Sequence, residues 1–276
     1  MTRLLFIGDI VGKPGRELVR RGLGALVAAH RIDLVIANVE NAAAGFGVTP
    51  DLAEDFLEYG VNVMTGGNHS WDKKEIIPYI ADQPRLLRPI NFPAGTPGRG
   101  RCIVRATNGV PVAVINAMGR VFMTAIDDPF RVVADEVREV ASEARVIFVD
   151  FHAEATSEKV AMGWHLDGQV TAIVGTHTHV QTADERVLPR GTAYITDVGM
   201  TGPHDSVIGV ERAAILQRFL TGMPQRFETA TENPRINGVI VDADEATGRA
   251  TSIARLSLST HQIEALVAQP AGSADR

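Results

Sequence analysis

The chain has 276 residues, of which 45% are hydrophobic and 22% charged, and its formal net charge at neutral pH is −6. Such a chain is long enough to bury a substantial core, and its acidic balance excludes a global basic field that would hold long DNA or RNA. The single cysteine, Cys102, excludes an internal disulfide and any site built from several thiolates. No apolar run is long enough to span a membrane, and the first residues lack the core of a signal peptide. We therefore expect a cytoplasmic protein without membrane contact.

Apolar runs and helical patterns alternate in the first third of the chain. The pattern predicts strands at 4–8, 33–38 and 61–67 and helices at 15–30, 49–60 and 72–81. Thr49, Pro50 and Gly60 suit the N-cap, the first turn and the end of the second helix, while Ser70 or Asp72 is the expected cap of the third. Repeated strand–helix units indicate a parallel α/β sheet.

The remaining elements have a more antiparallel character. Residues 86–100 are rich in Pro and Gly and predict a loop, whereas 101–119 predict a hairpin around an Asn-Gly turn. Further on we expect a helix at 131–143, strands at 145–151, 169–175 and 192–199, and a hairpin at 235–258. No composition break indicates a linker, so we expect one domain over 1–267, followed by a frayed tail at 268–276. The two halves together predict two packed sheets with helices outside.

The turn after the first strand, "GDIVGKPGR", has the glycine content of a phosphate-binding loop. A P-loop, however, needs four residues between its glycines and a hydroxyl residue after its lysine. Here Gly8 and Gly12 enclose only three residues, and Pro14, which lacks a backbone N–H, occupies the hydroxyl position. The turn does not fit a nucleotide cradle, which leaves Asp9 as a candidate metal ligand.

Polar residues follow several of the expected strands, at the sheet edge where α/β proteins build their sites. They are Asp9, Glu40, Asn41, Asn68, His69, His152, His177 and His179. Each alone has an ordinary explanation as a cap, a turn residue or a partner of loop backbone. The pair in "HTH" is more specific, because residues i and i+2 of an extended segment point to the same side. Carboxylates, amides and imidazoles in this number suit two divalent ions about 3.5–4 Å apart, an arrangement used for phosphoryl transfer.

The motifs "IGDIVG", "ANVEN", "GGNHSWD", "DFHAEATSEK" and "VGTHTHVQTAD" make the sequence similar to the calcineurin-like metallophosphoesterases. Two positions depart from that pattern: Val11 replaces the histidine of D-x-H, and Glu40, followed by Asn41, replaces the bridging Asp. Together with "TDVGMTGP", these departures resemble the bacterial 2′,3′-cyclic-nucleotide 2′-phosphodiesterase family, over at least residues 3–205. The resemblance implies a four-layer α/β/β/α sandwich, a centre of two divalent ions (iron or manganese) and a homo-oligomer.

The resemblance also implies roles for individual residues. One metal is held by Asp9, Glu40, Asn41 and His179, and the other by Glu40, Asn68, His152 and His177. A metal-bridging hydroxide opens the cyclic phosphodiester of a small nucleotide and leaves a 3′-phosphate. His69 protonates the leaving 2′-oxygen, stabilises the developing charge, or only orients its loop.

Several interpretations stay open beside this one. Arg16 and His204 are candidate substrate contacts, although Arg16 also suits a solvated helix start. Thr178, Glu154 and Asp197 are candidates to orient the imidazoles. The same centre would serve a phosphomonoesterase or another phosphodiesterase. A protein of another class would be a regulator that keeps the metal site for ligand sensing or for binding RNA-processing partners. Strong binding of long RNA by this acidic chain would need a local basic patch, for which the sequence offers Arg85, Arg88, Arg99, Arg101 and Arg105.

Overall fold

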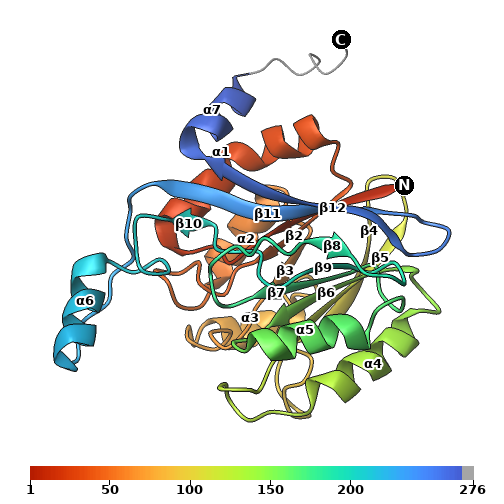
Figure 1. Cartoon of the computed structure of the whole chain (residues 1–276), viewed down its shortest axis with the longest axis horizontal. Coiled ribbons are helices and arrows are strands. Elements are labelled where there is room, and N and C mark those ends of the chain that lie inside the picture. Colours follow the sequence, from red (N-terminus) through yellow and green to blue (C-terminus); the bar gives the residue numbers. More distant parts are fainter. Residues whose placement is uncertain (269–276) are drawn as a thin grey trace.

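The computed structural model of the chain describes residues 1–268, so the expected frayed tail lies outside the described residues except for Ala268. Two sheets of six strands each form its centre (Figure 1). The first sheet contains β1 (Thr2–Ile7), β2 (Leu34–Asn38), β3 (Val63–Thr65), β10 (Gly202–Pro203), β11 (Pro234–Ala243) and β12 (Ala250–Ser259). The second contains β4 (Arg101–Arg105), β5 (Pro111–Met118), β6 (Val146–His152), β7 (Ala172–Thr176), β8 (Arg186–Val187) and β9 (Ala193–Ile195).

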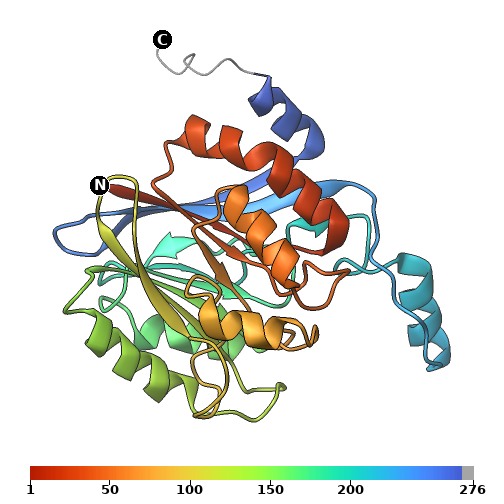
Figure 2. The same cartoon turned by 180° about the vertical axis from the view of Figure 1, so that it is seen from behind.

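Helices cover the outer faces of both sheets (Figure 2). The described residues form the helices α1 (Gly12–His30), α2 (Pro50–Glu58), α3 (Ile76–Asp82), α4 (Pro129–Val140), α5 (Thr156–His165), α6 (Arg212–Thr221) and α7 (Thr260–Val267). The helices α1, α2 and α7 lie on the side of the first sheet, and α4 and α5 lie on the side of the second (Figures 1 and 2). Among the described residues, no helix combines the length and apolar character that crossing a bilayer requires.

The alternation of side chains along each strand explains the layers. In β1, Leu4 and Phe6 face the second sheet, while Leu5 and Ile7 pack under the helices. In β6, Phe148 faces the first sheet and stacks on Phe6 with ring centroids 5.4 Å apart, whereas Val149 packs against α4 and α5. Successive strand residues point to opposite faces, so strands that are apolar on both faces give three cores. Three cores separate four layers, and the predicted α/β/β/α sandwich is confirmed.

Most of the predicted elements are present. The hairpins β4–β5 and β11–β12 pair antiparallel, β1 pairs parallel with β2, and the Thr49 hydroxyl accepts a hydrogen bond from the Leu52 N–H as an N-cap. The prediction for α3 is wrong at its start: the helix begins at Ile76, and neither Ser70 nor Asp72 caps it. Both side chains serve the preceding turn instead, since Ser70 donates to the Gly67 carbonyl and Asp72 contacts the His69 ring.

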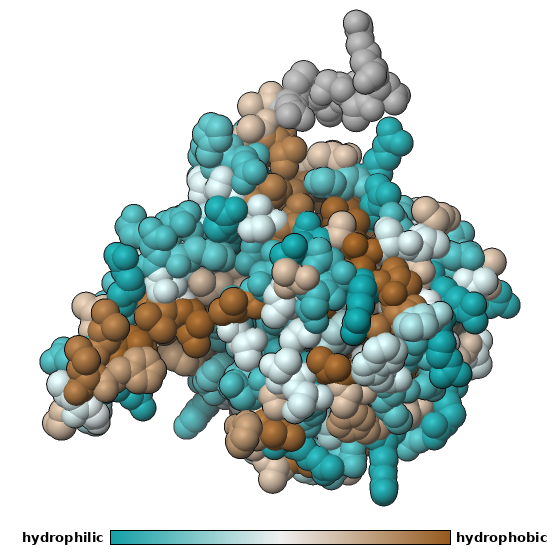
Figure 3. All heavy atoms as spheres, viewed as in Figure 1, coloured by the Kyte–Doolittle hydropathy of each residue, from teal (hydrophilic) through white to brown (hydrophobic). Residues whose placement is uncertain are grey.

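The helix α6 was not predicted and stands away from both sheets (Figures 1 and 2). Ile215 is its buried residue, while Leu216, Phe219 and Leu220 are exposed by 54%, 80% and 85%. Residues with this spacing share one face of a helix, and Figure 3 shows apolar side chains gathered along this projecting arm. The sequence analysis did not predict α6, because it looked for helices whose apolar face packs on a core, and this face does not.

Candidate metal centre

The candidate donors converge on one site at the carboxyl ends of strands from both sheets. Asp9 follows β1, Glu40 and Asn41 follow β2, and His152 ends β6. All four are at least 96% buried. The short turn after β7 adds two further histidines, and the turn after β3 adds an amide. Packing two sheets face to face therefore brings together residues that are more than a hundred positions apart.

His152 is the centre of this cluster. Its Nε2 lies 2.9 Å from Oε1 of Glu40 and 2.9 Å from Oδ1 of Asn68. Nδ1 of His177 is 3.0 Å from the same nitrogen. One ring nitrogen carries at most one proton, so hydrogen bonding alone does not satisfy three partners. A bound cation would satisfy these groups, because Glu40, His152 and His177 each offer a ligand atom within 4.8 Å of the others.

Two buried oxygens strengthen this assignment. Oδ1 of Asp9 and Oδ1 of Asn41 have no hydrogen-bond partner among the described residues. An unpaired buried acceptor is costly, and oxygen atoms of this kind are the preferred ligands of hard divalent ions. Asn41 is fixed in this orientation, since its Nδ2 donates to the Gly45 carbonyl at 2.9 Å. The residues present therefore fit a divalent metal.

Electrostatics in the metal-free site follow from burial and from the charges packed together. Burial opposes charge on Glu40, but the charge and hydrogen bond of His152 outweigh it and lower the pKa of Glu40 to about 2. Burial also opposes charge on His152, yet Glu40 and Asp9 outweigh it and raise the pKa of His152 to about 9. Burial and the nearby His152 charge lower the pKa of His177 to about 3. His152 is thus protonated at neutral pH without metal, and metal binding must release that proton.

A hydrogen-bonded relay orients His152. Its Nδ1 lies 2.9 Å from Oγ1 of Thr176, which lies 2.8 Å from Oδ1 of the fully buried Asp150. When Thr176 donates to Asp150, Nδ1–H of a neutral His152 donates to Thr176, and Nε2 is left as the ligand atom. Burial raises the pKa of Asp150 to about 7, against the hydrogen bond from Thr65. Sequence reasoning missed this relay, because Asp150 and Thr176 look like ordinary strand residues.

The loop with His177 and His179 differs from the predicted extended segment. Both residues have left-handed backbone, with φ of 96° and 64°. Their rings diverge: Nε2 of His177 lies 3.1 Å from Glu154, while Nδ1 of His179 contacts the Ile208 carbonyl at 2.8 Å. The alternation argument therefore does not apply to these two residues, and strained backbone of this kind persists only where its surroundings hold it.

A buried ion pair holds this loop. Oδ2 of Asp197 accepts from the N–H and the hydroxyl of Thr178, at 3.1 and 2.6 Å. The same oxygen lies 2.7 Å from Nζ of Lys159, which is 1% exposed on α5. Thr178 and Asp197 were predicted as orienting residues, and Lys159 was not. Lys159 is the last residue of the "HAEATSEK" motif, but its burial was not predicted, because a lysine in a helix normally indicates a solvated face.

His69 lies at the mouth of the site. Its backbone N–H donates to Oε2 of Glu40 at 2.9 Å, and its Nδ1 is 2.8 Å from Oδ2 of Asp72. Its ring packs edge-on against Phe46, with centroids 5.1 Å apart. These contacts fix the loop and the ring plane, and they leave Nε2 available to a bound molecule.

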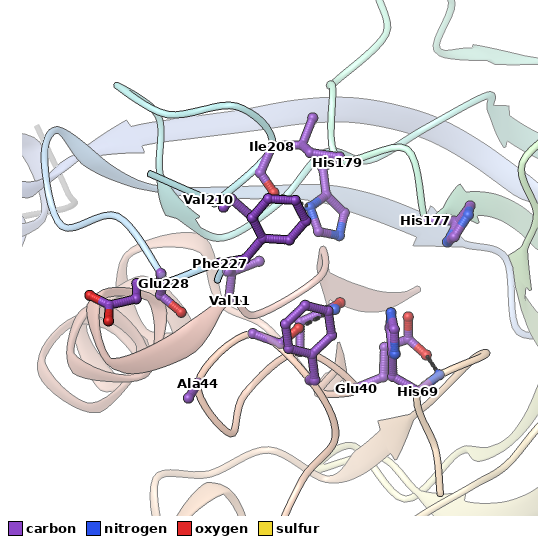
Figure 4. Close-up of a pocket in the computed structure, with 15 residues that line it drawn as sticks. Val11, Glu40, Ala44, His69, His177, His179, Ile208, Val210, Phe227 and Glu228 are labelled. Atoms are coloured by element: carbon purple, nitrogen blue, oxygen red, sulfur yellow. Dashed lines mark hydrogen bonds between the residues drawn. The ribbon is translucent and has the colours of Figure 1, made fainter. Parts of the chain in front are cut away.

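A cavity of about 600 Å³, including its open part, runs from these donors to an apolar wall. Its polar end is lined by Glu40, Asn41, His69, His177 and His179, and its apolar part by Val11, Ala44, Phe46, Ile208, Val210 and Phe227. Figure 4 shows His179, Ile208, Val210 and Phe227 on one side of the opening and Ala44, Glu40 and His69 on the other. This size is typical of sites for small molecules.

Comparison with known proteins shows the family to which the chain belongs. The sequence model of the YmdB-like protein family matches residues 5–256. The chain belongs to the YmdB-like family. The 2′,3′-cyclic-nucleotide 2′-phosphodiesterase of Bacillus subtilis is 50% identical to it over 93% of this chain and 97% of that protein. The predicted family is confirmed by this relative.

Solved structures agree with the fold of this YmdB-like protein. A phosphatase from Mycoplasma pneumoniae superposes with a TM-score of 0.88, at 34% identity over 94% of this chain and 93% of that one. A hypothetical protein from Thermus thermophilus gives a TM-score of 0.87, at 41% identity over 94% of this chain and 99% of that one.

Two predicted substrate contacts lie elsewhere in this YmdB-like protein. The Arg16 guanidinium donates to the Ala42 carbonyl, so it supports the loop beside Asn41. His204 is half-buried against Asn237 and the Gly202 carbonyl. Neither is among the residues that line this cavity.

Proposed function

We propose that the chain is a metal-dependent phosphodiesterase that hydrolyses 2′,3′-cyclic nucleotides to 3′-nucleotides. The observation that carries this proposal is the convergence of three donors on Nε2 of His152, beside unpaired buried oxygens, at the end of an open cavity. The Bacillus subtilis relative, named for this activity, supports the substrate class.

The donor set supports the predicted division of ligands between two divalent ions, iron or manganese. Asp9, Glu40, Asn41 and His179 would hold one ion, and Glu40 with Asn68, His152 and His177 the other. When bound, two such ions activate a water near neutral pH and offset the phosphoryl charge. The protein fixes the ligands before binding: the relay behind His152 and the ion pair behind Thr178 restrict both ligand loops.

We assign His69 to the leaving group. Its ring is oriented by Asp72 at Nδ1 and by Phe46 at its edge, and it lines the cavity beside Glu40. An imidazole in this position donates a proton to the departing 2′-oxygen, or a hydrogen bond to the developing charge.

The alternatives differ in what they require. A phosphomonoesterase would use the same donors, so turnover of a phosphomonoester must be compared with turnover of the cyclic nucleotide. A regulator that binds RNA needs free basic side chains, but Arg88 donates to four backbone carbonyls and Arg101 pairs with Glu136 and Glu139. These contacts favour a structural role for both arginines.

Hydrolysis of 2′,3′-cyclic AMP tests the proposal directly. The purified protein, loaded with Mn²⁺ or Fe²⁺ and analysed for metal, is expected to release a 3′-phosphate. His177→Ala is expected to abolish turnover, because it removes one of three converging donors, whereas the exposed His261→Ala is expected to turn over normally. Bound metal without turnover of the cyclic nucleotide, but with turnover of a phosphomonoester, would favour the alternative enzyme.

Metal binding is also expected to stabilise the fold. The donors come together only in the folded chain, so a bound ion adds about 2.7 kcal/mol to the free energy of unfolding when its concentration is about 100 times its Kd. Thermal unfolding with and without Mn²⁺ measures this shift. Asp9→Asn should reduce the shift and the exposed Asp51→Asn should retain it, whereas equal shifts in both variants would contradict Asp9 as a ligand.

A further inference from the structure

The cavity has two chemically different ends, and the proposed reaction uses one of them. The donors occupy the polar end, while the opposite part is lined by aliphatic and aromatic side chains. Several of these are unusually exposed for their type, with Phe46 at 39% and Ile208 at 51%. Apolar side chains held open beside a polar site are typical of a ligand pocket.

Local structure presents Phe46 at this position. The residues around it have left-handed backbone, with φ of 57° at Ala44, 93° at Gly45 and 77° at Gly47. Such a run forms a tight loop that directs the ring outwards instead of into the core. The ring then lies edge-on to His69, the residue that the proposed function assigns to the leaving group.

The opposite wall is built around Phe227. The segment around Phe227 pairs with the segment around Val210. The Ala230 N–H donates a hydrogen bond to the Gly209 carbonyl, and the Glu211 N–H donates one to the Glu228 carbonyl. The Arg218 guanidinium lies 5.1 Å from the centroid of the Phe227 ring, so it covers one face. The neighbouring Ile208 carbonyl contacts His179, which joins this wall to the donor end.

We infer that this apolar part is a stacking slot for the nucleobase, with Phe46 and Phe227 as the residues that select nucleotides over other small phosphodiesters. The inference rests on the proposed function, because the donor end must hold the phosphate. A base is flat and apolar on both faces, and stacking on an aromatic side chain changes affinity roughly 5- to 150-fold.

The test compares two substrates that differ only in the base. Kinetics are measured on 2′,3′-cyclic AMP and on 1-O-methylribose 2′,3′-cyclic phosphate, which lacks the base. The wild type is expected to prefer the nucleotide by roughly 5- to 150-fold in kcat/KM, through KM. Phe227→Ala should lose this preference and keep its rate on the base-free compound. Phe46→Ala should also lose the preference, but with a lower rate on both compounds, because Phe46 also orients the His69 ring. Phe227→Tyr should retain the preference, as should Phe219→Ala, which alters an exposed ring on α6.

A second measurement needs neither metal nor turnover. Adenosine binding to the metal-free protein is followed by ligand-observed NMR, and it is expected in the wild type and lost in Phe227→Ala. Equal kcat/KM for both substrates in the wild type would overturn the slot and leave the hydrolase intact. Equal losses on both substrates in Phe227→Ala would overturn it as well, by showing a structural role. Adenosine binding that depends on Phe227, without hydrolysis of either substrate, would support the slot and refute the proposed function.

Discussion

Replacement of Lys159 by methionine is expected to lower the free energy of unfolding by about 3–5 kcal/mol, because it leaves the Asp197 carboxylate buried and unpaired. Lys159 and Asp197 are 1% and 0% exposed, and Nζ lies 2.7 Å from Oδ2. Urea unfolding of the metal-free protein measures the loss. Metal affinity is expected to fall about 10- to 100-fold as well, since Asp197 also holds the Thr178 backbone between two ligands.

Two further variants separate the ion pair from a general packing effect. Lys74→Met removes an exposed lysine and is expected to change stability little. Lys159→Met combined with Asp197→Asn removes both charges, so it should recover part of the stability lost in the single variant. If Lys159→Met and Lys74→Met were equally stable, the buried pair would not support the loop.

His69→Ala is expected to reduce kcat for 2′,3′-cyclic AMP by about 10²- to 10⁴-fold while the metal content stays the same. The His69 ring lines the cavity but is not a predicted metal ligand, so its loss should slow the reaction without reducing metal binding. Steady-state kinetics and metal analysis on the same samples measure both quantities. Asp72→Asn should give a smaller loss, because Asp72 only orients the ring through Nδ1.

The leaving group distinguishes the two roles considered for His69. A ribose oxygen needs a proton to depart, whereas the phenolate of bis(4-nitrophenyl) phosphate does not. A general acid therefore predicts a much smaller effect of His69→Ala on the second substrate. Equal losses on both substrates would instead indicate stabilisation of charge on the phosphoryl group. Unchanged rates on both would leave His69 as a residue that only orients its loop.

The fold and the position of the site could be predicted because they depend on local patterns. Apolar runs that end in polar residues identified the donor-bearing strands, and the structure brings Asp9, Glu40 and His152 together at their ends. The Asn-Gly turn likewise predicted the β4–β5 hairpin, since that dipeptide suits a tight turn whatever surrounds it.

Features that depend on tertiary context could not be predicted in this way. The turn after β3 uses Ser70 and Asp72 for its own bonds, and the start of α3 moves to Ile76 as a result. Lys159 is buried only because α5 packs over the Asp197 carboxylate, which comes from a segment 38 residues away. A helical lysine that reaches a distant buried acid has no periodic signature in the sequence.

The left-handed backbone at His177 and His179 has a consequence for protein design. Each such residue costs about 1–3 kcal/mol relative to ordinary backbone, and here Thr178 is anchored between them by a buried carboxylate. A His-Thr-His segment grafted at the end of a strand in another scaffold would relax to extended backbone, and its histidine rings would point in other directions. A transferable unit would have to include the acid and the lysine along with the histidines, although they come from other elements of the fold.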